Sequence, residues 1–298
     1  MHHTAKQFAG VYTAIITPFN QNDELDLEAF SKLIDLQLKA GIDGLVICGS
    51  TGEGITLTDD ERFTLVKHAV KQVAGKIPVV AGAGHASTKI ACDLQKQMKA
   101  LGATATLHVT PWYNKPTTEG LYLHFSQVAE SSDLPIILYN VPGRTACDLP
   151  VDVILRLSQN YPNIIGLKDS NIDPVRIQQI LAKARPDFCF FSGEDGFVLP
   201  LLAMGGQGVI SVCSNIVPKT MLDMIRAYHD DNMTEAQTIA ARIAELTPVM
   251  FMKSNPIPVK SSAHLMGLIE NTFRLPLCPL SKNDMDTLRQ KLSAQGWL

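Results

Sequence analysis

The 298-residue chain has few charged residues, few aromatic residues and no long apolar run. Charged residues make up 18% of the chain and aromatic residues 6%, and the formal net charge is −3. This near-neutral balance gives no electrostatic support for a nucleic-acid partner. No apolar run approaches the ~18 residues of a membrane span, so the sequence predicts no membrane partner either.

Paired cysteine motifs are also missing. The six cysteines form no CxxC pair and no zinc-ligand spacing with histidine, and most of them lie in apolar runs: Cys48, Cys92, Cys147, Cys189, Cys213 and Cys278. We therefore expect buried, reduced thiols in a cytoplasmic protein, and no metal site. His85, His108 and His264 show no ligand spacing, so we expect them to be structural. Residues 1–6 contain no apolar stretch, so the sequence predicts no secretion signal.

Apolar residues, by contrast, are plentiful at 46% of the chain, which indicates a large buried core. They recur in short β-branched runs bordered by glycine or proline, as is typical of buried parallel strands. Eight such runs are present, at residues 11–17, 44–48, 78–81, 104–109, 136–140, 164–168, 188–192 and 208–212.

The stretches between these runs predict amphipathic helices. In residues 27–39, Phe30, Leu33, Ile34 and Leu38 share one helical face. Thr58 followed by Glu61 forms a capping box that begins the next helix. Further helices are predicted at residues 59–73, 87–100, 118–131, 151–159, 175–184 and 196–204.

Eight strand–helix units predict an α/β fold, the (β/α)8 TIM barrel. A doubly wound open sheet is the alternative, but the first strand is followed by Thr17-Pro18-Phe19 and not by a glycine-rich nucleotide fingerprint. After residue 212 the pattern is helical, at residues 221–229, 233–252, 259–269 and 281–294. We expect a catalytic barrel over residues 1–225 and a C-terminal helical segment over residues 226–298 that packs on it.

Reactive groups of such barrels lie at the carboxyl ends of the strands. Lys168 ends the sixth apolar run, where a partly desolvated amine can attack a carbonyl and form a Schiff base. The alternative is a lysine that reaches water or pairs with Asp169. Tyr139 ends the neighbouring fifth run, and its hydroxyl could move protons for imine formation or could simply lie in the core.

Two further strand ends carry groups that suit carboxylates. The turn at residues 49–53 offers the hydroxyls of Ser50 and Thr51 together with backbone N–H groups. Arg144, in a Pro-Gly-Arg turn, could clamp a second carboxylate or could be a solvated surface residue. Gly205, Gly206 and Gly208 precede or open the eighth strand and are expected to form turns rather than a phosphate site.

Taken together, these motifs resemble the family of 4-hydroxy-tetrahydrodipicolinate synthase (dihydrodipicolinate synthase), within the N-acetylneuraminate lyase superfamily. The resemblance covers nearly the whole chain and depends on the order and spacing of modest motifs. These are residues 13–19, 49–53, 110–114, 139–144, 166–168, 208–211 and 255–260.

The resemblance implies a lyase of lysine (diaminopimelate) biosynthesis, a class I aldolase that condenses pyruvate with L-aspartate 4-semialdehyde to 4-hydroxy-tetrahydrodipicolinate. It implies that Lys168 forms the Schiff base and that Tyr139, Ser50 and Tyr113 relay protons, with Tyr113 reaching in from a neighbouring subunit of a homotetramer. No cofactor is implied, because the protonated imine is itself the electron sink.

The resemblance also assigns the binding groups. Thr51 and the turn amides would hold the pyruvate carboxylate, and Arg144 would hold the carboxylate of the semialdehyde. Gly193 and Ile210 would line the pyruvate pocket through their backbones.

Two departures from the family pattern bear on function. Ser50-Thr51 stands where the synthases usually have two threonines, and Ser-Thr is typical of the lyases. An N-acetylneuraminate lyase or a sugar-acid aldolase is therefore the alternative. Arg144 and the Trp112-Tyr113-Asn114 segment, by contrast, are of synthase type. A non-catalytic binding protein of the same fold is a further alternative.

The second departure concerns feedback. The positions that bind lysine in inhibited members carry Ala86, Ile90, Asp59, Arg62 and Trp112, which predicts weak or absent inhibition by lysine.

Overall fold

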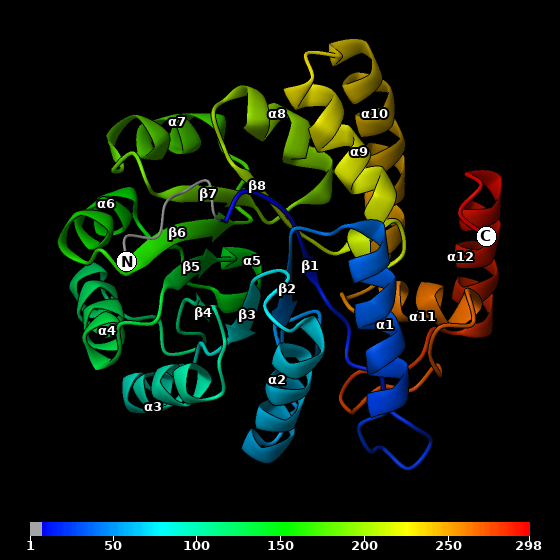
Figure 1. Ribbon diagram of the computed structural model, residues 1–298, viewed down its shortest axis with the longest axis horizontal. Coiled ribbons are helices and arrows are strands. Elements are labelled where there is room, and N and C mark those ends of the chain that lie inside the picture. The colour runs from blue at the N-terminus through cyan, green and yellow to red at the C-terminus, as the bar shows by residue number, and fades with distance from the viewer. Residues whose placement is uncertain (1–7) are drawn as a thin grey trace.

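Eight parallel strands form a closed barrel in the order of the sequence, as the alternating pattern predicts (Figure 1). The computed structural model describes residues 8–298, so the N-terminal segment predicted to lack a secretion signal lies outside the described residues. The strands are β1 (Gly10–Ala14), β2 (Gly44–Ile47), β3 (Val79–Gly82), β4 (Ala105–Val109), β5 (Ile136–Asn140), β6 (Ile164–Asp169), β7 (Cys189–Ser192) and β8 (Gly208–Ser211).

Helices follow the strands and form the outer layer. They are α1 (Leu27–Ala40), α2 (Asp59–Val73), α3 (Thr88–Ala100), α4 (Thr118–Ser131), α5 (Pro142–Thr145), α6 (Val151–Asn160), α7 (Pro174–Lys183), η2 (Asp195–Phe197), α8 (Val198–Ala203), η3 (Cys213–Asn215) and α9 (Pro218–His229). The four-residue α5 and the 3₁₀ turn η3 were not predicted, because they are too short to show a helical period, and the helix predicted at residues 196–204 is divided into η2 and α8.

Local chemistry sets where these helices begin. Thr58 accepts a hydrogen bond from the Glu61 N–H, and the Glu61 carboxylate accepts one from the Thr58 N–H, so the predicted capping box of α2 is confirmed. Asp173 accepts from two N–H groups of α7, and Pro174 occupies its first position, where its missing N–H costs nothing.

The barrel closes between β8 and β1, where Gly208 pairs with Gly10. A Cβ on Gly208 would lie 1.9 Å from the Gly10 carbonyl oxygen, and Gly208 has a φ of +158°. The two backbones can approach this closely only without a side chain. The interior is filled by apolar residues from all eight strands, among them Tyr12, Ile165 and Ile210.

Three helices follow the barrel: α10 (Met233–Met250), α11 (Ile257–Leu265) and α12 (Lys282–Ala294). α10 packs on α8 and α9, and α11 with α12 lies beyond α1 on the same side of the barrel (Figure 1). The predicted barrel limit at residue 225 falls inside α9. No helix within residues 8–298 combines the length and apolar composition that a bilayer crossing requires.

One sequence expectation about the cysteines was wrong in part. Cys48, Cys147, Cys189 and Cys213 are buried, but Cys92 is half-buried and Cys278 is exposed. Cys278 lies in the irregular segment between α11 and α12, where no strand or helix face shields it, so its apolar neighbours in sequence do not predict burial. Burial raises the pKa of the Cys48 thiol to about 12, which keeps it in the unreactive thiol form.

Candidate active site

Lys168 lies near the carboxyl end of β6 and is 5% exposed. Asp169, the next residue along the strand, accepts hydrogen bonds from Arg176 Nε at 3.0 Å and Asn140 Nδ2 at 2.9 Å. Successive strand residues face opposite sides of a sheet. The Asp169 carboxylate therefore lies on the other side of the sheet from Lys168 and is paired with Arg176. Within residues 8–298 no carboxylate lies within ion-pair distance of Lys168.

Tyr139 stands directly opposite Lys168 in the register of β5 and β6. The Lys168 Nζ lies 4.3 Å from the centroid of the Tyr139 ring, and Tyr139 is 6% exposed. Within the described residues the Tyr139 hydroxyl is not held by a hydrogen bond to another side chain, so it is free to serve a ligand. The barrel therefore brings the predicted amine and the predicted phenol together.

The turn at residues 49–53 lies at the carboxyl end of β2. Its backbone closes on itself, because the Glu53 N–H donates to the Ser50 carbonyl at 3.2 Å and the Gly54 N–H donates to the Gly49 carbonyl at 3.1 Å. Ser50 is exposed, whereas Thr51 is buried and its Oγ1 accepts from Asn255 Nδ2 at 2.9 Å. The turn thus presents one accessible hydroxyl and one that a residue from beyond the barrel holds in place.

Arg144 lies on α5, the short helix that follows β5. Pro142 at the first position of α5 fixes the chain there, and Arg144 Nη2 donates to the Asn255 carbonyl oxygen at 3.3 Å. The Arg144 side chain is exposed. Asn255 was not predicted to take part, yet it contacts both Thr51 and Arg144.

A cavity of about 680 Å³ opens at this end of the barrel. Ser50, Tyr139, Arg144 and Asn255 line it, and its volume is ample for two small carboxylic acids. Lys168 adjoins it through the Tyr139 ring.

Glu194 is a further ionisable group of this site, and sequence reasoning gave it no role. Burial raises the pKa of its carboxyl group, as does the neighbouring Asp195, while Lys168 and Arg144 act in the opposite direction. The carboxyl group therefore lies within electrostatic reach of both predicted cations. Its place directly after β7 is the only signal in the sequence that could have drawn attention to it.

The other predicted site residues take different positions. Gly193 follows β7, and a Cβ there would lie 2.1 Å from Ser170 Oγ, so a larger residue would have to displace that hydroxyl. Ile210 lies in the barrel interior with its side chain fully buried. Tyr113 has a φ of +75° and is 92% exposed, and it is not among the residues that line the cavity with Ser50, Tyr139 and Arg144.

Four of the five positions predicted to replace lysine ligands border the same cavity, and Ala86 does not. Asp59, Arg62, Ile90 and Trp112 line it, and the Arg62 guanidinium donates to the Gly82 and Gly54 carbonyls. In this part of the cavity both terminal nitrogens of Arg62 therefore already donate to backbone carbonyls.

A sequence model described as the Dihydrodipicolinate synthetase family matches residues 7–295 of the chain. The chain belongs to the dihydrodipicolinate synthetase family. The resemblance expected from the strand-end motifs is therefore confirmed at the level of the family.

Individual members of the dihydrodipicolinate synthetase family agree with this assignment. The 4-hydroxy-tetrahydrodipicolinate synthase of Nitratidesulfovibrio vulgaris is 45% identical over 292 residues, which cover 98% of this chain and 100% of that protein. The crystal structure of dihydrodipicolinate synthase from Thermotoga maritima is similar with a TM-score of 0.95 at 43% identity, covering 98% of this chain and 100% of the other. The Cyanidioschyzon merolae enzyme, whose structure has lysine bound, has a TM-score of 0.95 at 36% identity, covering 98% and 99%.

Proposed function

We propose that this protein condenses pyruvate with L-aspartate 4-semialdehyde and forms 4-hydroxy-tetrahydrodipicolinate, a step of lysine biosynthesis. The observation that carries the proposal is Lys168, a buried amine with no carboxylate partner among residues 8–298, beside the Tyr139 ring and a cavity bordered by Arg144. Family membership agrees with it, since the relatives described above are named as synthases of this product.

In the proposed mechanism, the neutral amine of Lys168 attacks the keto carbon of pyruvate to give a carbinolamine, which takes up a proton and loses water to give a protonated imine. The imine draws electrons from the methyl group, so that group loses a proton and becomes the nucleophilic carbon of an enamine. In this proposal Tyr139 and Ser50, which both line the cavity, carry these protons.

The enamine carbon then attacks the aldehyde carbon of the semialdehyde, whose oxygen takes up a proton. The amino group of the same substrate attacks the imine carbon, closes the ring and displaces the Lys168 amine. We assign the pyruvate carboxylate to Thr51 and the turn amides and the semialdehyde carboxylate to Arg144, which suits bidentate binding. Gly193 and Ile210 complete the pyruvate pocket through their backbones in this proposal.

Reduction with borohydride in the presence of pyruvate tests the proposal directly. We expect a reduced three-carbon adduct on the peptide that contains Lys168, and none in Lys168→Ala. Absence of the adduct from the unaltered protein would rule out the Schiff base. Assays with aspartate semialdehyde and with N-acetylmannosamine then separate the synthase from the lyase alternative that Ser50 raises.

We further propose that Tyr113 completes the active site of a neighbouring subunit in a homotetramer. The support is its 92% exposure on a bent backbone, outside the cavity that Tyr139 and Arg144 line. Co-assembly of Lys168→Ala with Tyr113→Phe tests this proposal, because mixed oligomers would regain a site with both groups intact. A fully active monomer would contradict it.

We place this activity in the cytoplasm, where the four buried cysteines would stay reduced.

A further inference from the structure

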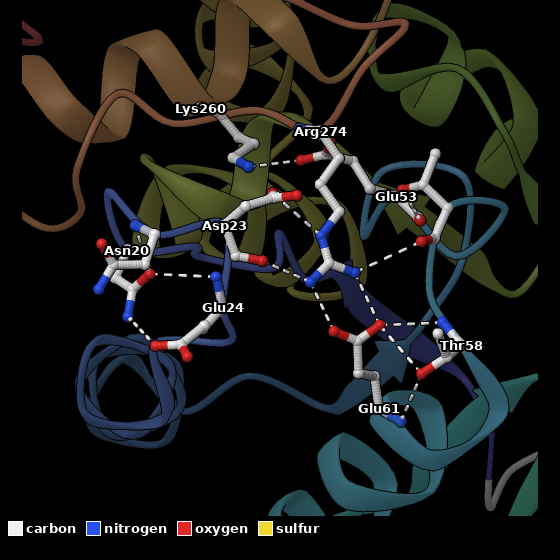
Figure 2. Close-up of polar contacts among 10 residues, drawn as sticks. Asn20, Asp23, Glu24, Glu53, Thr58, Glu61, Lys260 and Arg274 are labelled. Carbon is white, nitrogen blue, oxygen red and sulfur yellow. Dashed lines mark hydrogen bonds and ion pairs between the residues drawn. The ribbon is translucent and has the colours of Figure 1, made fainter.

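A buried ion pair joins the C-terminal helical segment to the carboxylate-binding turn. Lys260, on α11, donates to Glu53, the last residue of the turn at residues 49–53 (Figure 2). Both side chains are fully buried, and the two residues are 207 positions apart in sequence. Neither residue takes part in the mechanism proposed above.

The surroundings hold this pair tightly. Lys260 Nζ lies 4.5 Å from the centroid of the Phe19 ring and 4.7 Å from that of Phe273, so two aromatic faces share its charge. The Arg274 N–H donates to the second carboxylate oxygen of Glu53 at 3.3 Å. Burial lowers the pKa of Lys260, and Glu53 acts against that shift, so the ammonium form depends on its partner.

Two further ion pairs hold the chain at Arg274, next to the buried pair. The Arg274 guanidinium lies between the carboxylates of Asp23 and Glu61, which come from the loop after β1 and from α2 (Figure 2). Glu61 also caps α2 through Thr58. The chain at residue 274 is thereby held against the turn by two separate parts of the barrel.

Glu53 needs this support because its backbone is unfavourable. Its φ of 53° is in the left-handed region, which costs a residue with a Cβ free energy that surrounding contacts must offset. The same turn is held at Gly52, whose carbonyl accepts from Thr17 Oγ1 at 2.7 Å, and at Thr51 by Asn255. The segment at residues 255–260 therefore contacts both ends of the Thr51–Glu53 corner.

Stability alone does not account for a buried charged pair. Replacing such a pair by apolar residues of similar size is often neutral or stabilising, so an apolar contact would hold α11 to the barrel as well. A charge-assisted hydrogen bond is directional, unlike an apolar contact. The Glu53 carboxylate must point at the Lys260 Nζ of α11, and this requirement fixes the conformation of the turn at Glu53.

We propose that the Glu53–Lys260 pair is a positioning element of the active site, which holds residues 49–53 in the conformation that binds the pyruvate carboxylate. The claim rests on the function proposed above. It makes α11, which lies outside the barrel, a working part of the site.

Two double variants test this proposal in the full-length protein. Glu53→Met/Lys260→Met removes both charges and leaves none unpaired, so we expect it to fold with a thermal midpoint near that of the unaltered protein. The pyruvate concentration that half-saturates borohydride trapping should rise about tenfold or more, because small displacements of positioning groups are costly. Glu53→Gln/Lys260→Gln restores a neutral hydrogen bond and should recover most of that loss.

The control is Arg185→Met, at the opposite end of the barrel, where Arg185 donates to the carbonyls of Ser158, Tyr161 and Ile164. It should lower the thermal midpoint and leave half-saturation by pyruvate unchanged. A Met/Met variant that traps pyruvate at wild-type concentrations would overturn the proposal, as would one that fails to fold.

Hydrogen exchange keeps this test independent of the proposed reaction. In the Met/Met variant the amides of Glu53 and Gly54 should exchange faster without any substrate, while those of β5 stay unchanged. Unaltered exchange in the turn would overturn the positioning role. A missing adduct in the unaltered protein would instead overturn the Schiff-base function and leave the exchange result to decide the role of the pair.

Discussion

Two buried histidines make the fold sensitive to mild acid. His108, on β4, donates through Nε2 to Gln95 Oε1 at 3.0 Å, and its Nδ1 has no partner among residues 8–298. The tautomer follows from Gln95, whose amide nitrogen donates to a carbonyl and whose oxygen must therefore accept. His124, on α4, bonds Thr88 through Nδ1, and its Nε2 likewise has no partner in that range.

The pKa shifts of His108 and His124 predict how the free energy of unfolding changes with pH. Burial lowers the pKa of His108 to about 3, with His124 acting in the same direction, and burial lowers the pKa of His124 to about 4, with His85 acting likewise. Below the ordinary value of about 6.5, the unfolded chain binds protons that the folded chain does not. The contribution of the two neutral rings to the free energy of unfolding is fully present above that pH, and it decreases as the pH falls toward their pKa values in the folded protein. At about 1.4 kcal/mol per pKa unit, lowering the pH from 7 to 5 costs roughly 2 kcal/mol for each ring.

Urea unfolding at pH 7 and pH 5 measures this loss. In His108→Gln, whose amide nitrogen can replace Nε2, the difference between the two pH values should shrink by roughly 2 kcal/mol. His229→Gln, on the exposed end of α9, controls for the number of histidines and should match the unaltered protein. If His108→Gln loses as much stability as the unaltered protein, the buried ring is not the cause and the reasoning fails.

Three further predictions concern the reaction. Lys168→Ala should abolish turnover, and Lys168→Arg should not restore it, since a guanidinium cannot form the imine; steady-state assays with both substrates decide this. Arg144→Ala should raise the KM for aspartate semialdehyde and lower kcat/KM by roughly 30-fold or more, the scale of a lost charge-assisted pair of about 2 kcal/mol. Borohydride trapping of pyruvate in Arg144→Ala should stay normal, and unchanged semialdehyde kinetics would remove the assigned role. Lysine at submillimolar concentration should leave turnover unaffected, because the Ala86 and Ile90 side chains offer an ammonium group no acceptor; half-maximal inhibition in that range would contradict this prediction.

Most of the barrel could be predicted from sequence because its strands carry a strong local signal. Residues 136–140 were predicted to the residue, and the other strands to within a few residues, since each is a short apolar run with glycine or proline nearby. The pairing of Lys168 with Tyr139 followed from the same regularity, because adjacent strand ends of a barrel meet at one mouth.

The support of the site could not be predicted, because it comes from residues distant in sequence. Asn255 is 204 positions from Thr51, and no period or motif relates the two. Lys260 follows three apolar residues at the start of α11, and nothing in that segment indicates its partner Glu53, which is 207 positions away. Only tertiary packing brings these groups to the turn.

The buried cationic side chains indicate where the chemistry lies. Within residues 8–298, three cationic side chains are buried: Lys168, Arg176 and Lys260. A charge removed from water is costly unless a partner compensates it, and two of the three have one, since Arg176 is paired with Asp169 and Lys260 with Glu53. Lys168 alone has no carboxylate within ion-pair distance in that range. A buried amine without a carboxylate partner does not stabilise the fold, so Lys168 has no structural reason to be there. Its position beside Tyr139 and next to the cavity makes it the group most suited to act as a nucleophile.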